Sequence, residues 1–193
     1  MGTATVNGKN IFYPPGGILM WIIIFLELFT FGMALVAMAY YSKEEPAIFH
    51  NSRMLLNTAY GTINTILLIT SGFFMAQSVK SLKEGAIKKS SWYLKLTMLG
   101  GLLFLILKSI EYYDKIEAGL TIGYNTFFTF YWMLTLFHVI HVIVGLVILG
   151  SVYLGLKNEK STTTIEDVEA SATFWHMCDL IWLMLFPIIY LIF

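Results

Sequence analysis

Two histidines stand inside a long apolar stretch, residues 127–150, that carries no formal charge. His138 and His141 are three positions apart, so a helix places them on one face. An imidazole in hydrocarbon needs a partner, because an unpaired polar group there raises the free energy. A metal ion would need a third and a fourth ligand, for which Glu27 and Glu111 are candidates. We favour the structural interpretation, in which both imidazoles are hydrogen-bonded between helices.

Glu27 poses the same problem in the first apolar stretch, residues 17–41. It lies roughly ten residues inside that stretch, and so about 15 Å deep at 1.5 Å per residue. A carboxylate at this depth is a candidate functional residue by default. The simpler interpretation, which we favour, is a hydrogen-bonded acid that fixes the register of two helices. Glu27 is therefore the first partner we expect for His138 or His141.

The last apolar stretch holds a cluster of polar and aromatic residues. Trp175, Asp179 and Trp182 follow one another at spacings of four and three, which makes a single helical stripe. His176 and Asp179 are three apart and can pair directly. If this span begins near residue 171, Asp179 lies close to the cytoplasmic entry and need not be deeply buried.

Glu111 closes the third apolar stretch, beside two tyrosines. A snorkelling carboxylate is ordinary at such a boundary. We group Glu111 with Trp175, His176, Asp179 and Trp182 as a polar network that packs helices together. Cys178 is the single cysteine, which excludes an intrachain disulfide and a CxxC motif, and we expect it to be a small buried residue.

Composition sets the class of protein. Of the 193 residues, 58% are hydrophobic and 12% are charged, whereas soluble domains carry about 25% charged residues. This indicates an integral membrane protein. The net charge of zero argues against nucleic acid as a partner.

Five stretches are long and apolar enough to cross a bilayer, which takes about 20 residues. They are residues 17–41, 58–79, 92–113, 127–150 and 171–193. We therefore predict an all-α membrane protein, a bundle of five transmembrane helices formed by residues 17–193 and preceded by a cytoplasmic segment, residues 1–16. The second span is rich in Gly, Ser and Thr, which favours close helix packing in lipid.

Orientation follows from the basic residues, because cytoplasmic loops are enriched in Lys and Arg. Eight fall on the side of the N-terminus and four on the other: Lys9, Lys80, Lys83, Lys88, Lys89, Lys95, Lys157 and Lys160 against Lys43, Arg53, Lys108 and Lys115. The N-terminus is expected in the cytoplasm and Phe193 on the periplasmic side.

Short patterns in fixed order run along nearly the whole chain. They are PGG…W…E..TFG around Glu27, LLNT at 55–58, SG at 71–72, EYY at 111–113, FF.F at 127–130, T.FH..HV..G at 135–145 and WH..D..WL.LFP..YL at 175–191. In this order the patterns resemble those of subunit III of the haem-copper oxidases, a family that includes the short NorE-like proteins associated with nitric oxide reductases. The first and the last pattern favour the NorE-like branch.

The resemblance implies a non-catalytic subunit of the bacterial inner membrane that lies beside catalytic subunit I. It implies no haem or copper in this chain, with haem and copper or iron in the partner. It also implies bound membrane phospholipids and a role in sustained proton uptake, and Glu27 matches an intramembrane carboxylate of the family. Seven-helix members carry two further N-terminal helices and a lipid-filled cleft, which do not carry over. Oxygen or nitric oxide as substrate, and cytochrome c or quinol as donor, are settled by the catalytic subunits.

Two other classes of function remain as alternatives. A small proton or solute transporter would use Glu27, His138 and His141 as a relay, but repeat-built transporters show two similar halves, and these five spans are unlike. A membrane metalloenzyme would need more His, Asp and Glu residues converging on the two histidines.

Overall fold

The computed structural model describes residues 16–157 and 163–193, so the predicted segment 1–16 lies almost wholly outside the described residues. The elements are α1 Gly17–Glu44, α2 Pro46–Met54, α3 Thr58–Lys83, α4 Ile87–Glu117, α5 Thr126–Lys157, α6 Ile165–Pro187 and the π-helix η1 Ile188–Ile192. Five of them, with α6 continued by η1, are long and apolar enough to cross a membrane. The predicted all-α bundle of five membrane helices is confirmed.

Helix starts agree with the prediction where a breaker or a cap marks them. α1 begins at Gly17, directly after the Pro and Gly cluster, and α3 begins at Thr58. The side chain of Asn57 accepts a hydrogen bond of 3.0 Å from the Ala59 N–H, which satisfies one of the free donors at the start of α3.

α6 begins six residues before the predicted start near residue 171. A capping box sets this boundary. Thr164 Oγ1 accepts from the Asp167 N–H at 3.2 Å, and the Asp167 carboxylate accepts from the Thr164 N–H at 2.7 Å. The first turns of α6 are polar, so hydropathy alone does not reveal them.

α3 and α4 make the most extensive contact between two described helices, because small residues let the two backbones come close together. Ser71 Oγ donates to the Thr97 carbonyl at 2.9 Å, and Ser78 Oγ donates to the Ser90 carbonyl at 3.0 Å. A Cβ at Gly100 would lie 2.8 Å from the Ser71 Cβ. The Gly, Ser and Thr content of the second span therefore has the packing role predicted for it.

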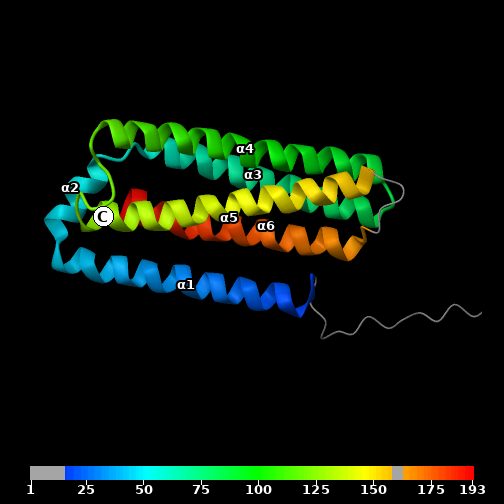
Figure 1. Cartoon of the computed structure of the whole chain (residues 1–193), viewed down its shortest axis with the longest axis horizontal. Coiled ribbons are helices and arrows are strands. Elements are labelled where there is room, and N and C mark those ends of the chain that lie inside the picture. The colour runs from blue at the N-terminus through cyan, green and yellow to red at the C-terminus, as the bar shows by residue number, and fades with distance from the viewer. Residues whose placement is uncertain (1–15, 158–162) are drawn as a thin grey trace, which may run out of the picture.

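α6 is the centre of the bundle. Figure 1 shows it between α3 and α1, with α5 alongside and α1 at the edge of the bundle. The Trp175 side chain of α6 is fully buried, and it fits against Gly101 of α4 and Gly145 of α5, where a Cβ would press on the indole ring. The C-terminus lies at the end of the bundle opposite the start of α1 (Figure 1).

The connection between α1 and α3 contains a helix that the sequence analysis did not predict. α2 begins with Pro46 in its first turn, a position where the missing N–H costs nothing. Arg53 Nε donates to the Tyr190 carbonyl at 3.1 Å, and Lys115 Nζ donates to the Leu55 carbonyl at 2.5 Å. These two contacts fix α2 across one end of the bundle, against η1 and α4.

Candidate functional site

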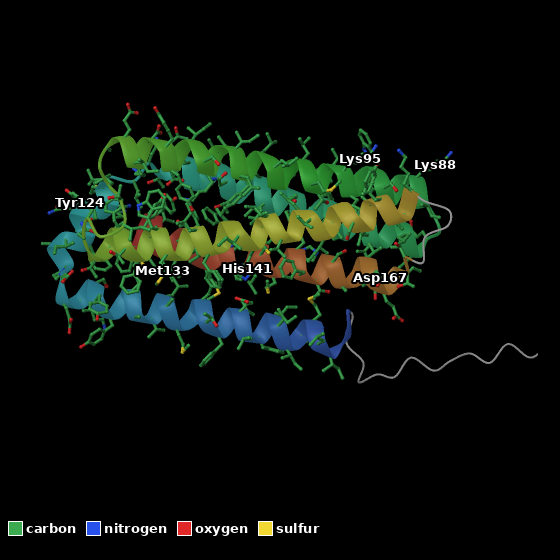
Figure 2. The ribbon with its side chains drawn as sticks, in the orientation of Figure 1. Lys88, Lys95, Tyr124, Met133, His141 and Asp167 are labelled. Carbon is green, nitrogen blue, oxygen red and sulfur yellow. The ribbon has the colours of Figure 1, made fainter. Side chains whose placement is uncertain are left out.

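The polar pair predicted between the first and fourth spans is present. Glu27 Oε2 lies 3.2 Å from Nε2 of His141, a distance at which the two groups form an ion pair when both are charged. Figure 2 labels His141 near the middle of α5, on the part of the helix that runs beside α1 and α6. Phe31 and Phe137 stand edge-on to the imidazole, so the surroundings of the pair are apolar.

The orientation of the His141 ring is fixed by a hydrogen bond within its own helix. Its Nδ1 lies 2.8 Å from the carbonyl oxygen of Phe137, and a carbonyl only accepts, so Nδ1 donates. Nε2 therefore points to Glu27 Oε2, which lies 3.2 Å away but has no hydrogen bond of good geometry in the described part of the chain. The pair is a close polar contact between α1 and α5.

His138 occupies a different environment, although it is only three residues from His141. Its side chain is fully buried, and within the described part of the chain neither ring nitrogen has a hydrogen-bond partner. Phe104 stands edge-on to the ring, and Trp182 lies against it with centroids 5.3 Å apart. The expectation that both histidines bond between helices is therefore wrong for His138, which the structure holds by aromatic packing.

Glu111 is the acceptor in a buried cluster at the end of the bundle near α2. Its carboxylate accepts from Lys108 Nζ at 3.0 Å, from the Tyr190 hydroxyl at 2.6 Å and from the Tyr131 hydroxyl at 2.9 Å. The side chain has no exposed surface. The expectation that it snorkels to the far surface is wrong, because α4 continues to Glu117 and so places Glu111 inside the helix.

Lys108 completes this cluster, although from the sequence alone we expected only a basic residue of the far side. Its Nζ is enclosed by four aromatic rings, with centroids 5.0 to 5.4 Å away: Tyr112, Tyr131, Trp182 and Tyr190. These ring faces and the Glu111 carboxylate offset the cost of burying the ammonium. The spacing of three between Lys108 and Glu111 is the sequence signal that would have revealed the pair.

The predicted aromatic stripe of α6 makes two hydrogen bonds to α3. Trp175 Nε1 donates to Ser71 Oγ at 3.0 Å, and Trp182 Nε1 donates to Thr65 Oγ1 at 2.9 Å. Asp179 lies between the two indoles along the helix. These hydrogen bonds tie α6 to α3 at two depths.

Asp179 and His176 pair as expected, with Nδ1 of the imidazole 3.5 Å from Oδ2. Asp179 is only 8% exposed, so the expectation of a shallow position is wrong. The early start of α6 at Ile165 is the reason, because it moves Asp179 deeper into the helix. A Cβ at Gly72 of α3 would overlap the Asp179 carboxylate, which shows how closely the helices meet there.

The predicted polar network is thus two separate groups rather than one. Glu111 belongs to the Lys108 cluster, whereas Trp175, His176 and Asp179 belong to the contact between α6 and α3. Trp182 touches both groups, since its ring faces Lys108 and its indole N–H bonds to α3. Cys178 is buried on α6, as expected from the sequence.

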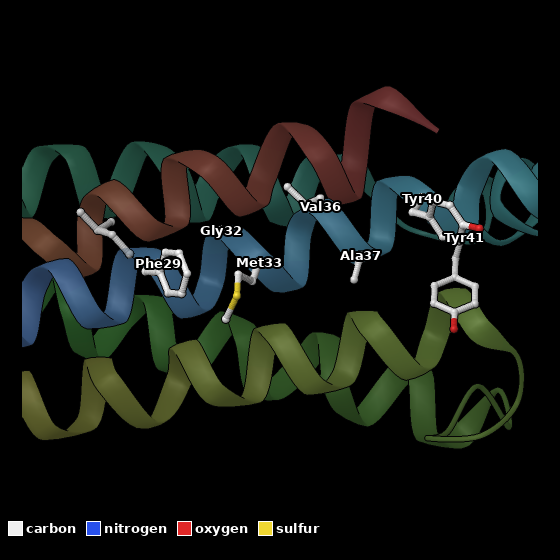
Figure 3. Close-up of a pocket in the computed structure, with 8 residues that line it drawn as sticks. Phe29, Gly32, Met33, Val36, Ala37, Tyr40 and Tyr41 are labelled. Atoms are coloured by element: carbon white, nitrogen blue, oxygen red, sulfur yellow. The ribbon is translucent and has the colours of Figure 1, made fainter.

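Two further features of the surface and interior bear on chemistry. The outer face of α1 carries an open apolar hollow of about 690 Å³ between Leu28 and Tyr41, lined by α1 alone (Figure 3). Among the residues that the structure describes, no three His, Cys, Asp or Glu side chains converge as metal ligands.

Comparison with known proteins agrees with this architecture. The sequence model of the family described as cytochrome c oxidase subunit III matches residues 16–192. A cytochrome bo(3) ubiquinol oxidase subunit 3 from Buchnera aphidicola is 26% identical over 89% of this chain and 84% of its own length. A cytochrome c oxidase subunit 3 from Synechocystis is 30% identical over 98% of this chain and 86% of its own length.

A longer relative, the cytochrome c oxidase subunit 3 of Osphranter robustus, is 36% identical over 66% of this chain. The match covers 48% of that relative, so the chain spans about half its length. The family match includes all five membrane helices with the residue patterns around Glu27, His141 and Asp179. The chain belongs to the cytochrome c oxidase subunit III family, a non-catalytic membrane subunit of the haem-copper oxidases.

Proposed function

We propose that this chain is the accessory subunit of a terminal respiratory oxidase and lies beside the catalytic haem-copper subunit. Haem and copper are held by that partner. The observation that carries this proposal is the family match over residues 16–192, which spans the whole described membrane domain. The relatives named above are subunits of a ubiquinol oxidase and of cytochrome c oxidases, which favours an oxidase over a nitric oxide reductase.

The chain acts by supporting the stability of the catalytic subunit and its sustained proton uptake. A rigid bundle suits the first role. The Lys108 and Glu111 cluster ties α4 to α5 and η1, and the two indole bonds tie α6 to α3. Glu27 and His141 form a polar contact of 3.2 Å that helps to hold the peripheral helix α1 against α5.

The chain resides in the bacterial inner membrane with its N-terminus in the cytoplasm and its C-terminus in the periplasm. Lys80, Lys83, Lys88 and Lys89 surround the connection between α3 and α4, at the cytoplasmic end of this arrangement. Lys108 lies inside the bundle and does not belong to a far-side loop. The difference in loop charge between the two sides therefore exceeds the count of eight against four.

The test is purification from native membranes through a tag on this chain. We expect a haem-containing polypeptide to co-purify, with a reduced-minus-oxidised haem spectrum and oxygen consumption. A preparation that consumes nitric oxide instead would place the chain in a reductase. A colourless preparation of this chain alone would contradict the proposal. Deleting the chain should shorten the period over which the catalytic subunit sustains turnover.

A further inference from the structure

α6 has one open face, and a titratable side chain lies on it. α5, α3 and α1 cover the rest of α6, whereas His176, Leu180 and Leu183 form an exposed stripe at spacings of four and three. The imidazole of His176 is 44% exposed, and the two leucines are 46% and 42% exposed. We name this stripe the α6 open face.

The open face lies at membrane depth. Lys83 Nζ and Glu169 Oε1 form an ion pair of 2.6 Å at the end of the bundle where α6 begins, with Lys83 half exposed. His176 follows Glu169 by seven residues, which is about 10 Å further along the helix. The stripe also falls within the candidate membrane span Ile165–Ile192. With the Lys83 and Glu169 pair taken as the edge of the membrane, the stripe faces hydrocarbon, which suits Leu180 and Leu183 but makes an exposed imidazole costly.

Two exposed hydroxyl side chains of the membrane helices are satisfied by their own helices. Thr30 Oγ1 donates to the Leu26 carbonyl at 2.9 Å, and Ser109 Oγ donates to the Leu105 carbonyl at 2.8 Å. The His176 imidazole instead places its Nδ1 3.5 Å from Asp179 Oδ2, and its Nε2 lies on the other side of the ring. Facing lipid, this nitrogen would have no partner, which is costly in hydrocarbon.

We propose that the α6 open face is the binding site for a transmembrane helix of the catalytic subunit. That helix places a hydrogen-bonding side chain, such as a hydroxyl, an amide or an indole, opposite His176 Nε2. The inference rests on the proposed function, and it adds which face of the chain meets the partner. Apolar side chains of the partner helix cover Leu180 and Leu183.

The neighbouring surface of α3 can contact a helix that is bound to the α6 open face. Ile69 and Ala76 are exposed on either side of Gly72, the glycine that lies against Asp179. A Cβ at Gly72 would also lie 3.4 Å from His176 Nδ1, so the imidazole stands beside α3. A helix on the open face would therefore contact α6 and α3 together, with the polar contact near the centre of the interface.

Photo-crosslinking in the intact complex tests the placement. A photoreactive residue replaces Leu180, and a matched control replaces Val147, which is 68% exposed on α5. We expect the Leu180 position to give a covalent adduct with the haem-bearing polypeptide at a higher yield than the Val147 position. Adducts of Leu180 with lipid only, or with a second copy of this chain, would overturn the inference, as would an equal or higher yield from Val147.

Co-purification is measured before irradiation, which separates the two proposals. If the haem-bearing polypeptide is absent at that stage, the proposed function has failed. If it is present and the adduct pattern is one of the contrary ones, only the placement on the α6 open face has failed.

A second measurement tests the polar contact itself. His176→Leu should weaken retention of this chain by the haem-bearing subunit in a detergent series by about 3-fold to about 20-fold, the range of a membrane hydrogen bond. His176→Gln, which keeps hydrogen-bonding groups, should retain most of the binding. Ser151→Leu on the exposed face of α5 is the control. Unchanged retention of His176→Leu would contradict the proposed contact.

Discussion

Glu27 Oε2 and His141 Nε2 lie 3.2 Å apart and join α1 to α5 inside the membrane domain. α1 is the peripheral helix of the bundle, and this contact is its polar attachment to α5. The neighbouring bond from His141 Nδ1 to the Phe137 carbonyl fixes the orientation of the ring. The arrangement therefore positions α1 against α5 through a polar contact between two side chains.

A Glu27→Gln substitution separates the two roles open to this carboxyl group. We expect oxygen turnover against pH, and its time course, to match the wild type, because the Gln amide can donate to His141 Nε2 and keep the register of α1. The measurement is made on the intact complex, with Glu44→Gln at the exposed end of α1 as control. A shifted pH profile with the subunit retained would assign Glu27 to proton delivery.

Lys108→Met should destabilise the chain strongly. It leaves the Glu111 carboxylate buried with two tyrosine hydroxyls and no cation, and breaking a buried pair costs about 3–5 kcal/mol. The double variant Lys108→Met with Glu111→Gln should recover most of the loss, since no unpaired charge remains. The free energy of unfolding in a denaturing detergent titration measures both. Equal stability of the single and double variants would show that the ion pair does not govern this region.

Gly101→Ala tests how tightly the Trp175 indole is packed against α4. An added Cβ would press on the ring and on Leu146, and overpacking of this kind costs about 1–3 kcal/mol. Gly150→Ala is the matched control, because nothing lies within 4 Å of a Cβ built there. The loss of thermal stability should appear at position 101 and not at position 150. Similar behaviour of the two variants would mean that the indole moves aside freely.

The sequence predicted the membrane spans, and the partners of single residues, better than it predicted how deeply a residue is buried within its helix. Hydropathy located five helices. The need of a buried carboxylate for a partner predicted that Glu27 meets His138 or His141, and the structure shows that it meets His141. Depth was misjudged for Glu111 and Asp179, because helix ends with polar turns extend beyond the apolar windows. The capping box at Thr164 was the available signal for α6.

The Lys108 and Glu111 cluster and the position of α2 could not be read from the sequence. The Lys108 and Glu111 cluster draws Tyr131 from α5 and Tyr190 from η1, and no spacing relates these residues. α2 was missed because it is short and its surroundings are polar, and its position depends on Arg53 and on the end of the chain. Local patterns predicted elements here, and the three-dimensional packing decided which polar groups meet.

The two central histidines should respond oppositely to the same substitution. His141→Leu removes the contact with Glu27 and leaves that carboxyl group without its partner, so it should cost about 0.6 kcal/mol, with about 1.7 kcal/mol as the upper range for a membrane hydrogen bond. His138→Leu removes an imidazole that has no hydrogen-bond partner in the described part of the chain, between Phe104 and Trp182. Replacing an unsatisfied buried polar group by an apolar one of similar size is neutral or stabilising.

Each histidine variant is the control for the other, since they lie three residues apart on one helix and receive the same side chain. Unfolding in a denaturing detergent titration should place His138→Leu at or above the wild type and His141→Leu below it. A larger loss at His138 than at His141 would contradict the packing described here. It would show that the His138 imidazole is hydrogen-bonded in the assembled membrane protein.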